Sequence, residues 1–278
     1  MKRDLAILDY SIYGNRPDPL SDNLLAQAAR AAGWRPLISP LEPPGPPAVT
    51  PECVWLRYDL RSRSELSWVV SVADRLQQRG HRVFPSAAAI LLAEDKWETF
   101  HAFRQRGIPT PETLLGLELA RCALPVILKP RVGWGGKGCL RLHAAADRAA
   151  ATTRVAVTTR VAEDDICQPY LAHQRTWIVA VAGGQEIVTL QEPRNDPAHE
   201  GETQVRPAPP GAVSLALAAL DAVGLVAGTV DLIESPAGLL VLEVNSAPRI
   251  PYPDLPDLDL ATPMVRSVLA WMERPCAS

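Results

Sequence analysis

The chain has 278 residues, of which 47% are hydrophobic and 21% charged, and its formal charge is -3 at pH 7. This composition is typical of soluble globular proteins and excludes a disordered or fibrous chain. The small negative charge gives no overall attraction to nucleic acid. No apolar run approaches the roughly 20 residues that span a bilayer, and the first residues lack a signal-peptide pattern. We therefore expect a cytoplasmic protein with neither nucleic acid nor membrane as partner.

The first part of the chain alternates strand-like and helix-like segments. Its predicted strands are 5–10, 53–60 and 81–85, and its predicted helices are 21–32 and 65–78. Ser21 is the expected N-cap of the first helix. Such alternation predicts parallel strands in an α/β unit. We assign residues 1–88 to this N-terminal domain.

Residues 89–278 have a different pattern. A helix is expected from Glu94 to Gly107, because acidic residues favour its N-terminus and glycine its end. Further helices are expected at 213–223 and 262–273. Three strand pairs follow the first helix: 125–130 with 138–142, 176–182 with 185–190, and 229–234 with 238–245. This region therefore predicts an antiparallel α+β domain, divided into a small subdomain at about 110–170 and a C-terminal one at about 171–278.

The last strand pair carries two acidic residues. If its turn is centred on Ala237, Asp231 lies opposite Glu243, and Asn245 shares their face. The other face is apolar and carries Val230, Leu232, Leu242 and Val244. Opposed carboxylates destabilise a strand pair unless a cation lies between them, and this donor set suits Mg²⁺ bound together with phosphates. The alternative is a solvated hairpin face.

A glycine-rich loop joins the first strand pair. Its glycines are Gly133, Gly135, Gly136 and Gly138, and lysines stand before and within it at Lys129 and Lys137. Glycine lets backbone N–H groups approach phosphate oxygens, although a merely flexible turn has the same composition. Lys96, Arg194 and Arg206, each considered alone, are ordinary exposed residues. Together, these features favour a site for a nucleotide and a metal.

The same residues resemble the ATP-grasp superfamily and, within it, the RimK-like carboxylate–amine ligases. The resemblance runs from about Val83 to Met272 through VFPSAAAILLAEDKWETFHAFRQRGIPTPET, PVILKPRVGWGGKGCLRL, ICQPYL and TVDLIESPAGLLVLEVNSAP. It implies an ATP-grasp fold preceded by a small α/β domain. It also implies a cytoplasmic ligase that uses ATP and Mg²⁺, with Mn²⁺ as an alternative metal.

The resemblance also implies roles for individual residues. ATP would be held by Lys96, Lys129, the loop residues Gly133, Gly135, Gly136 and Lys137, and the hinge residues Gln168, Tyr170 and Leu171. The metal would be held by Asp231, Glu243 and Asn245. Arg194 would steady the transferred phosphate or the acyl phosphate. Beyond the resemblance, we take Arg249 as a second catalytic candidate. A substrate carboxylate would become an acyl phosphate, which an amine would convert to an amide.

Departures from the family pattern concern the substrates. HQRTWIVAV replaces an Asp-Ile-Arg stretch, and Arg249 stands where glycine is common. Four arginines are candidate clamps for a substrate carboxylate, or else ordinary ion-pair partners: Arg57, Arg175, Arg206 and Arg249. We expect an amino acid as one substrate and a small molecule or a peptide as the other. A homo-oligomer is a further expectation for this chain. The alternatives are an ATP-grasp kinase and a nucleotide-binding module without turnover.

Overall fold

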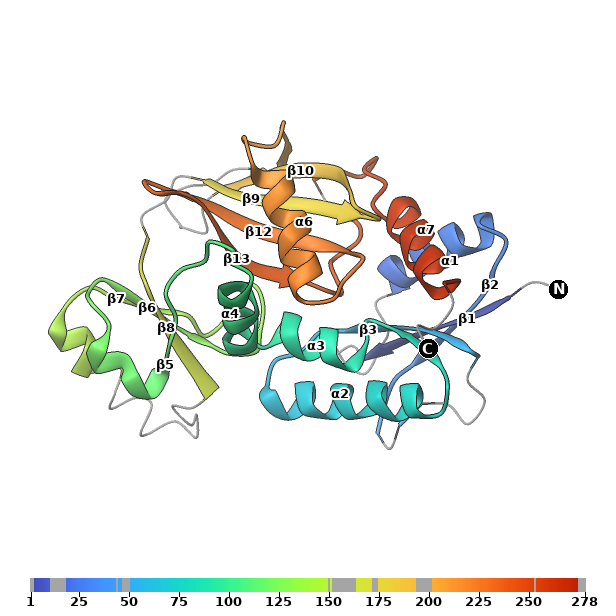
Figure 1. Ribbon diagram of the computed structural model, residues 1–278, viewed down its shortest axis with the longest axis horizontal. Helices are drawn as coiled ribbons and strands as arrows, with labels where there is room; N and C mark the ends of the chain where they lie inside the picture. The colour runs from blue at the N-terminus through green and yellow to red at the C-terminus, as the bar shows by residue number, and fades with distance from the viewer. Residues whose placement is uncertain are drawn as a thin grey trace.

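The computed structural model describes residues 3–10, 19–43, 45–46, 51–149, 151, 164–171, 175–193, 202–252 and 254–274. Three sheets organise this part of the chain (Figure 1). The N-terminal sheet has the order β2-β1-β3-β4, the small sheet β5-β8-β6-β7, and the large sheet β11-β10-β9-β12-β13. The small sheet stands apart at one end of the molecule, which leaves the α4 region between it and the other two sheets (Figure 1).

The strands and helices have the following bounds. The strands are β1 (Asp4–Tyr10), β2 (Arg35–Pro40), β3 (Cys53–Tyr58), β4 (Arg82–Phe84), β5 (Leu114–Leu115), β6 (Val126–Pro130), β7 (Leu140–Leu142), β8 (Asp165–Pro169), β9 (Arg175–Ala182), β10 (Gln185–Pro193), β11 (Gln204–Val205), β12 (Ala227–Ser235) and β13 (Gly238–Asn245). The helices are α1 (Pro19–Ala31), α2 (Arg63–Gln78), α3 (Ala87–Glu94), α4 (Lys96–Gln105), α6 (Ala212–Ala222) and α7 (Ala261–Met272), with the short 3-10 helix η1 (Gly116–Arg121).

The N-terminal sheet is parallel throughout, which confirms the predicted α/β unit. Two details differ from the prediction. Strand β2, which the sequence analysis missed, lies at the sheet edge, where its two prolines are tolerated because one side needs no partner. Helix α1 begins at Pro19, a residue suited to a first turn, so Ser21 is not its N-cap. Ser21 Oγ instead accepts a hydrogen bond from Ile250 N at 3.3 Å.

The helix expected from Glu94 to Gly107 is present as α4, and the sequence analysis missed α3, which precedes it and meets it at Asp95. Asp95 has an extended backbone (φ -93°, ψ 106°), ends α3, and caps α4 by accepting a hydrogen bond from Trp97 N at 3.0 Å. A side chain that can bond to a free N–H of the next helix favours such a break. Consequently Lys96 is the first residue of α4.

The three predicted antiparallel pairs are present as β6–β7, β9–β10 and β12–β13. Helix α6 lies across the large sheet, and α7 lies beside α1 of the N-terminal domain (Figure 1). Buried residues of both regions, including Leu5, Phe103, Val230 and Val268, belong to one hydrophobic core. The domain boundary near residue 88 stays a prediction. No helix in the described part of the chain is long and apolar enough to cross a bilayer.

The β12–β13 hairpin corrects one part of the predicted register. Asp231 does lie opposite Glu243, but Leu232 lies opposite Val241, because a bulge at Leu242 interrupts the ladder. The turn is one position tighter than expected, with Ser235 opposite Gly238. Val241 is therefore fully buried, while Leu242, predicted on the apolar face, is half-buried. The bulge restores the predicted pairing of the two acidic residues.

Candidate active site

The two acidic residues of the hairpin lie opposite each other and are half-buried. Loss of solvation raises the pKa of Asp231 well above its ordinary value, and the negative charges of Glu243 and Glu192 raise this pKa further. Asn245 Nδ2 donates a hydrogen bond to Asp231 Oδ1 at 3.3 Å. Two neighbouring carboxylates repel each other when both are ionised. The hairpin therefore forms a site that favours a proton or a cation.

Two lysines reach the same place from other elements. Lys96 Nζ lies 3.6 Å from Glu243 Oε2 and donates a hydrogen bond to Gly133 O at 2.6 Å. Lys129, on β6 of the small sheet, is 9% exposed. The pKa of Lys129 is lowered, because burial and the charge of Lys96 outweigh the opposite effect of Glu243 and Asp231. The structure thus brings Lys96, Lys129 and the carboxylates together from α4, the small sheet and the large sheet.

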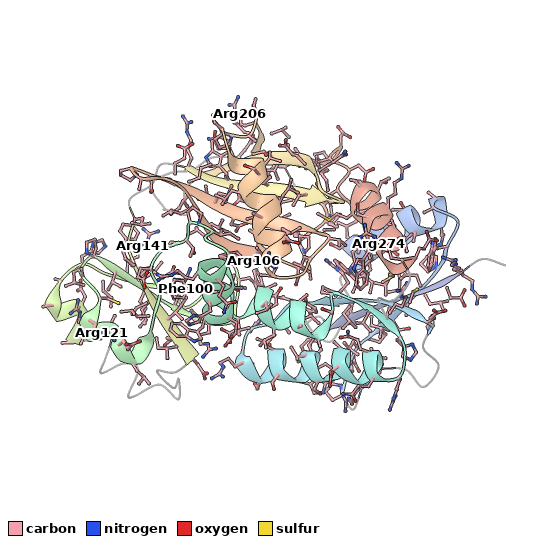
Figure 2. All side chains as sticks on the ribbon, viewed as in Figure 1. Phe100, Arg106, Arg121, Arg141, Arg206 and Arg274 are labelled. Carbon is pink, nitrogen blue, oxygen red and sulfur yellow. The ribbon has the colours of Figure 1, made fainter. Side chains whose placement is uncertain are left out.

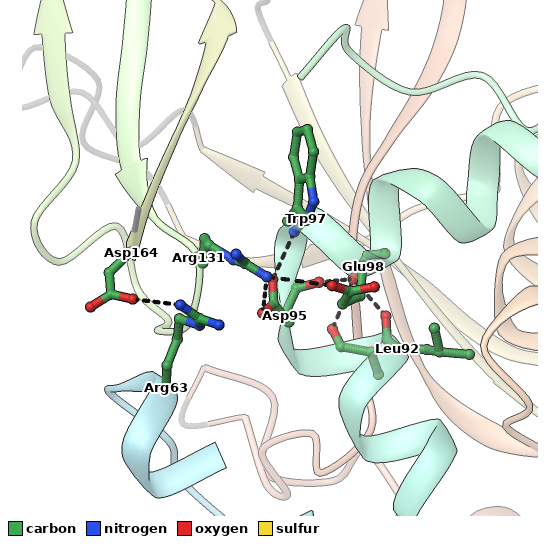
Figure 3. Close-up of polar contacts among 9 residues, drawn as sticks. Arg63, Leu92, Asp95, Trp97, Glu98, Arg131 and Asp164 are labelled. Carbon is green, nitrogen blue, oxygen red and sulfur yellow. Dashed lines mark hydrogen bonds and ion pairs between the residues drawn. The ribbon is translucent and has the colours of Figure 1, made fainter. Parts of the chain in front are cut away.

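A buried ion pair holds the start of α4 against the small sheet (Figure 3). Arg131 Nε donates to Asp95 Oδ1 at 2.9 Å, and Arg131 Nη2 donates to Asp95 Oδ2 at 2.6 Å. In addition, Lys96 N donates to Arg131 O at 3.0 Å. Such paired bonds impose a definite geometry on both side chains. They fix Lys96 beside the root of the glycine-rich loop.

The glycine-rich loop requires backbone angles that favour glycine. Gly133, Gly135, Gly136 and Gly138 all have positive φ, between 63° and 140°. Lys137 Nζ lies 3.9 Å from the centre of the Trp134 ring, and Arg61 of the N-terminal domain lies 5.9 Å from it. The Arg61 contact places Trp134 of the loop beside the segment between β3 and α2. The loop therefore lies between the Lys96 end of the site and that segment.

The hinge residues follow or belong to β8. Gln168 is buried, and its Nε2 donates to Thr113 Oγ1 at 2.8 Å, so its side chain is engaged within the small subdomain. Tyr170 N donates to Pro125 O at 2.9 Å, and Arg141 lies 5.2 Å from the Tyr170 ring centre. Leu171 is half-buried. Adenine contacts by these residues stay a prediction, and the Gln168 amide nitrogen and the Tyr170 N–H already have protein partners.

The catalytic roles of the two predicted arginines, Arg194 and Arg249, stay predictions. Arg194 lies outside the described residues. Arg249 is exposed, and its charge lowers the pKa of Tyr252, which burial raises. The nearby Asp231 and Glu192 raise the pKa of Tyr252 as well. Arg249 therefore stands at the rim of the carboxylate site. Arg206 lies farther out, just past the edge strand β11 of the large sheet (Figure 2).

The side chains of Asp231, Glu243 and Asn245 fit a divalent cation of the Mg²⁺ type. This set contains only two carboxylates, and the described residues hold no metal-binding group made of three or more His, Cys, Asp or Glu side chains. Asp231, Glu243 and Asn245 offer two carboxylates and an amide oxygen, and Mg²⁺ is commonly bound by one or two carboxylates together with substrate phosphates. A cation bound by these side chains would offset the loss of solvation and the repulsion that raise the pKa of Asp231.

A family model decides the relationship of this chain to known proteins. The model of the ATP-grasp domain matches residues 93–251, which is more than half of the chain. The chain belongs to the ATP-grasp family. This membership and the three-sheet architecture confirm the predicted ATP-grasp fold with a preceding α/β unit.

Individual relatives and solved structures support the same placement of this ATP-grasp chain. It is 29% identical over 195 residues to a probable alpha-L-glutamate ligase of Haemophilus influenzae, an alignment that covers 65% of this chain and 64% of that protein. The aligned part is thus slightly less than two thirds of the relative. D-cycloserine synthetase has a TM-score of 0.76 at 19% identity, covering 97% of this chain and 100% of the other. A RimK-domain ATP-grasp protein of Sphaerobacter thermophilus has a TM-score of 0.69 at 20% identity, covering 96% and 99%.

The structure of this ATP-grasp chain adds site residues that the sequence analysis missed. Arg131 and Glu192 are the clearest cases, since one fixes Lys96 and the other acts on the pKa of Asp231. Arg131 carried a usable signal, because it directly follows Lys129 and Pro130 at the start of the loop. Glu192 carried none, since its strand had been expected to end at residue 190. Only the extension of β10 to Pro193 places Glu192 at the site.

Proposed function

We propose that this protein is an ATP- and Mg²⁺-dependent, ADP-forming carboxylate–amine ligase that makes an amide bond through an acyl phosphate. The observation that carries the proposal is the convergence of Lys96 with Asp231 and Glu243, with Lys129 beside them. Two cations and two carboxylates in one partly buried place suit phosphoryl transfer, which depends on positioning and charge neutralisation rather than on a protein nucleophile.

The chain's own residues would each act on the nucleotide in a defined way. Lys96 would exchange its contacts with Gly133 and Glu243 for ATP phosphate oxygens, and Lys129 would bind phosphate oxygens beside it. The N–H groups of the glycine-rich loop, with Lys137, would cover those phosphates and exclude water. A substrate carboxylate held beside the terminal phosphate would attack it and form the acyl phosphate. An amine would then displace phosphate and leave the amide.

Asp231, Glu243 and Asn245 would hold Mg²⁺. When bound, the ion would neutralise phosphate charge and act as a Lewis acid toward the phosphoryl oxygens. Mn²⁺ accepts similar oxygen donors and is the alternative metal. In this role Asp231 must be ionised, so the site is expected to lose metal as the pH falls.

We further propose an amino acid as one substrate. The glutamate ligase named among the relatives supports this substrate class. The exposed Arg249, at the rim of the carboxylate site, would contact the reacting group, as would Arg194. A small carboxylate or amine is the expected second substrate, with a peptide end as the alternative.

The proposal is tested by measuring ADP release from Mg-ATP across pools of amino acids and carboxylated metabolites, with mass spectrometry on every active pool. We expect at least one pool to give an ATP-dependent condensation product. Glu243→Gln should lower kcat at least roughly 100-fold, the usual scale for losing a major transition-state charge interaction. Glu234→Gln is the matched control, because Glu234 lies on β12 outside the cluster and bonds to Trp177 Nε1 at 3.0 Å.

Three outcomes would contradict the ligase. A phosphorylated product that is stable without an amine would indicate a kinase. ATP binding without ADP release in any pool, peptides included, would indicate a nucleotide-binding module. Equal loss of activity in Glu243→Gln and Glu234→Gln would show that the carboxylate cluster has no special role.

A further inference from the structure

Arg57, at the carboxyl end of β3, is a buried arginine with incomplete hydrogen bonding. Only 6% of the surface of this residue is exposed. Nη2 donates to Pro248 O at 3.0 Å, whereas the buried Nη1 has no hydrogen-bond acceptor among the described residues. The ion pairs among the described residues do not include Arg57. A carbonyl oxygen is thus the one acceptor that this part of the structure provides.

A buried guanidinium in this situation is energetically unfavourable. Arginine stays protonated at all ordinary pH values, so it cannot relieve burial by losing its charge. A buried charge normally has a counter-ion, and a buried N–H normally has an acceptor. The position of Arg57 is therefore explained if an external anion completes its hydrogen bonds. A guanidinium matches a carboxylate well, because its planar fork can give two parallel bonds.

Arg57 also lies where a ligand is expected. Open parallel sheets bind ligands beyond the carboxyl ends of their strands, and Arg57 is the penultimate residue of β3. Its partner Pro248 is three residues after Asn245 of the metal site, at most about 11 Å away along an extended chain. The guanidinium therefore stands beside the segment that leaves the metal site.

A second contact fixes the end of β3 to that segment. Ser246 Oγ donates to Glu94 Oε1 at 2.6 Å and lies 2.5 Å from the Tyr58 hydroxyl, which is left to act as the donor. Tyr58 is the next residue after Arg57, and Ser246 is the next after Asn245. The N-terminal sheet and the metal site are thus joined by two bridges, through Arg57 and through Tyr58.

The other three candidate clamps differ from Arg57 in exposure. Arg175, Arg206 and Arg249 are all exposed, and Arg206 Nη2 donates to Gln204 Oε1 at 2.5 Å. Exposed arginines are solvated and need no ligand to compensate their charge. Burial and the bare Nη1 therefore distinguish Arg57 within the set.

We propose that Arg57 determines substrate specificity by binding the unreacted carboxylate of an amino acid substrate. This inference rests on the proposed ligase function and adds the position and chemistry of one substrate group. The lysines and metal ligands hold the phosphate end of the site, and Arg57 holds the substrate from the N-terminal domain. A substrate in which that carboxylate is an amide loses the charge that Arg57 recognises.

The test is a cycle in which the arginine and the ligand carboxylate are removed separately and together. Isothermal titration calorimetry measures binding of L-amino acids and their α-carboxamides to protein loaded with Mg²⁺ and AMPPNP, for wild type, Arg57→Gln and Arg57→Lys. We expect the wild type to prefer at least one acid over its amide by roughly 10- to 100-fold, the scale of a charge-assisted hydrogen bond. Arg57→Gln should bind acid and amide equally, and Arg57→Lys should keep part of the preference.

Controls separate this inference from the proposed function and from misfolding. Arg35 begins the edge strand β2 of the same sheet and pairs with Asp4, so Arg35→Gln should keep the preference. Binding of Mg²⁺ and AMPPNP should be unchanged in all variants, while its absence in wild type would sink the proposed function. Three outcomes would each overturn the role of Arg57. Arg57→Gln could retain the preference for the acid, the wild type could bind no amino acid, or both Arg57 variants could lose nucleotide affinity.

Discussion

At the scale of single residues, the unusual feature of this protein is a carboxylate that its environment disfavours. Asp231 is half-buried opposite Glu243, and its pKa is raised because loss of solvation and neighbouring negative charges both oppose ionisation. An unfolded chain imposes neither cost. Folding therefore favours the protonated form of Asp231, and the metal-free protein carries a cost at neutral pH that a bound cation would remove.

This cost predicts a pH-dependent stability effect of Asp231→Asn. Because the folded-state pKa is raised, the contribution of Asp231 to stability is full below about pH 4 and is lost as the pH rises through the raised value. At pH 8, Asp231→Asn should therefore increase the free energy of unfolding, because the neutral amide avoids the cost of an ionised carboxylate at this position. At pH 4 the two proteins should be nearly equal. Urea unfolding at both pH values measures this.

Magnesium and a surface variant serve as controls for that measurement. Mg²⁺ should stabilise the wild type more at pH 8 than at pH 5, because a protonated carboxylate is a poor ligand. Asp221→Asn, which removes an exposed partner of Arg106, should show neither effect. Stabilisation by Mg²⁺ that is equal in Asp231→Asn and wild type would contradict the assignment of Asp231.

At the scale of elements, local backbone devices position the site. The break at Asp95 makes Lys96 the first residue of α4, and the bulge at Leu242 keeps Glu243 opposite Asp231. The glycine-rich loop is the third device, since its glycines have positive φ. Each device is a departure from regular structure, and each sets the direction of a charged side chain.

The loop predicts a specific effect of Gly135→Ala. Gly135 has φ 63° and open space around an added Cβ, so the variant suffers from backbone conformation rather than from collision. Holding alanine in this region costs about 1–2 kcal/mol, which corresponds to a decrease of roughly 5- to 30-fold in kcat/KM for ATP if the loop must keep its shape. Steady-state ADP release measures the decrease.

The matched control is Gly184→Ala, in the turn between β9 and β10. Gly184 has φ 81° and equally open surroundings, so its substitution imposes similar strain away from the nucleotide. It should lower the melting temperature and leave kcat/KM for ATP unchanged. If both variants lose activity equally, the loop has no particular part in ATP use.

At the scale of the whole molecule, helix α7 packs against elements from the first part of the chain. Helix α7 packs against α1 and β4, and Arg3 forms an ion pair with Glu273 at 2.7 Å. The buried residues of α7 belong to the core that also contains Leu5 and Val230. The N-terminal sheet and the large sheet should therefore unfold together.

Leu269→Ala tests this coupling. Leu269 is 3% exposed on α7, so its truncation should lower the free energy of unfolding by about 2–5 kcal/mol. Arg266→Ala, on the exposed side of the same helix, should change it by less than about 0.5 kcal/mol. Urea unfolding followed by circular dichroism and by tryptophan fluorescence should give one coincident transition in each variant. Two separate transitions would show that the sheets are independent.

The amino-acid sequence by itself determined the local features of this protein. Alternating apolar residues predicted the parallel N-terminal strands and the three antiparallel pairs, because side-chain periodicity depends on neighbours along the chain. The acidic pair opposite the apolar face of the hairpin was also predictable, although the tighter turn and the bulge that produce it were not. Edge strand β2 escaped prediction because its prolines resemble those of a loop.

Only the tertiary structure decided which distant residues share a site. Lys96, Lys129 and Glu243 meet because α4, the small sheet and the large sheet converge, and no spacing along the chain encodes that convergence. The same holds for Arg57, one of four similar arginines in the sequence, which differs from the others by its burial against Pro248. Burial and electrostatic environment arise from packing between elements, so they become visible only once those elements are placed in space.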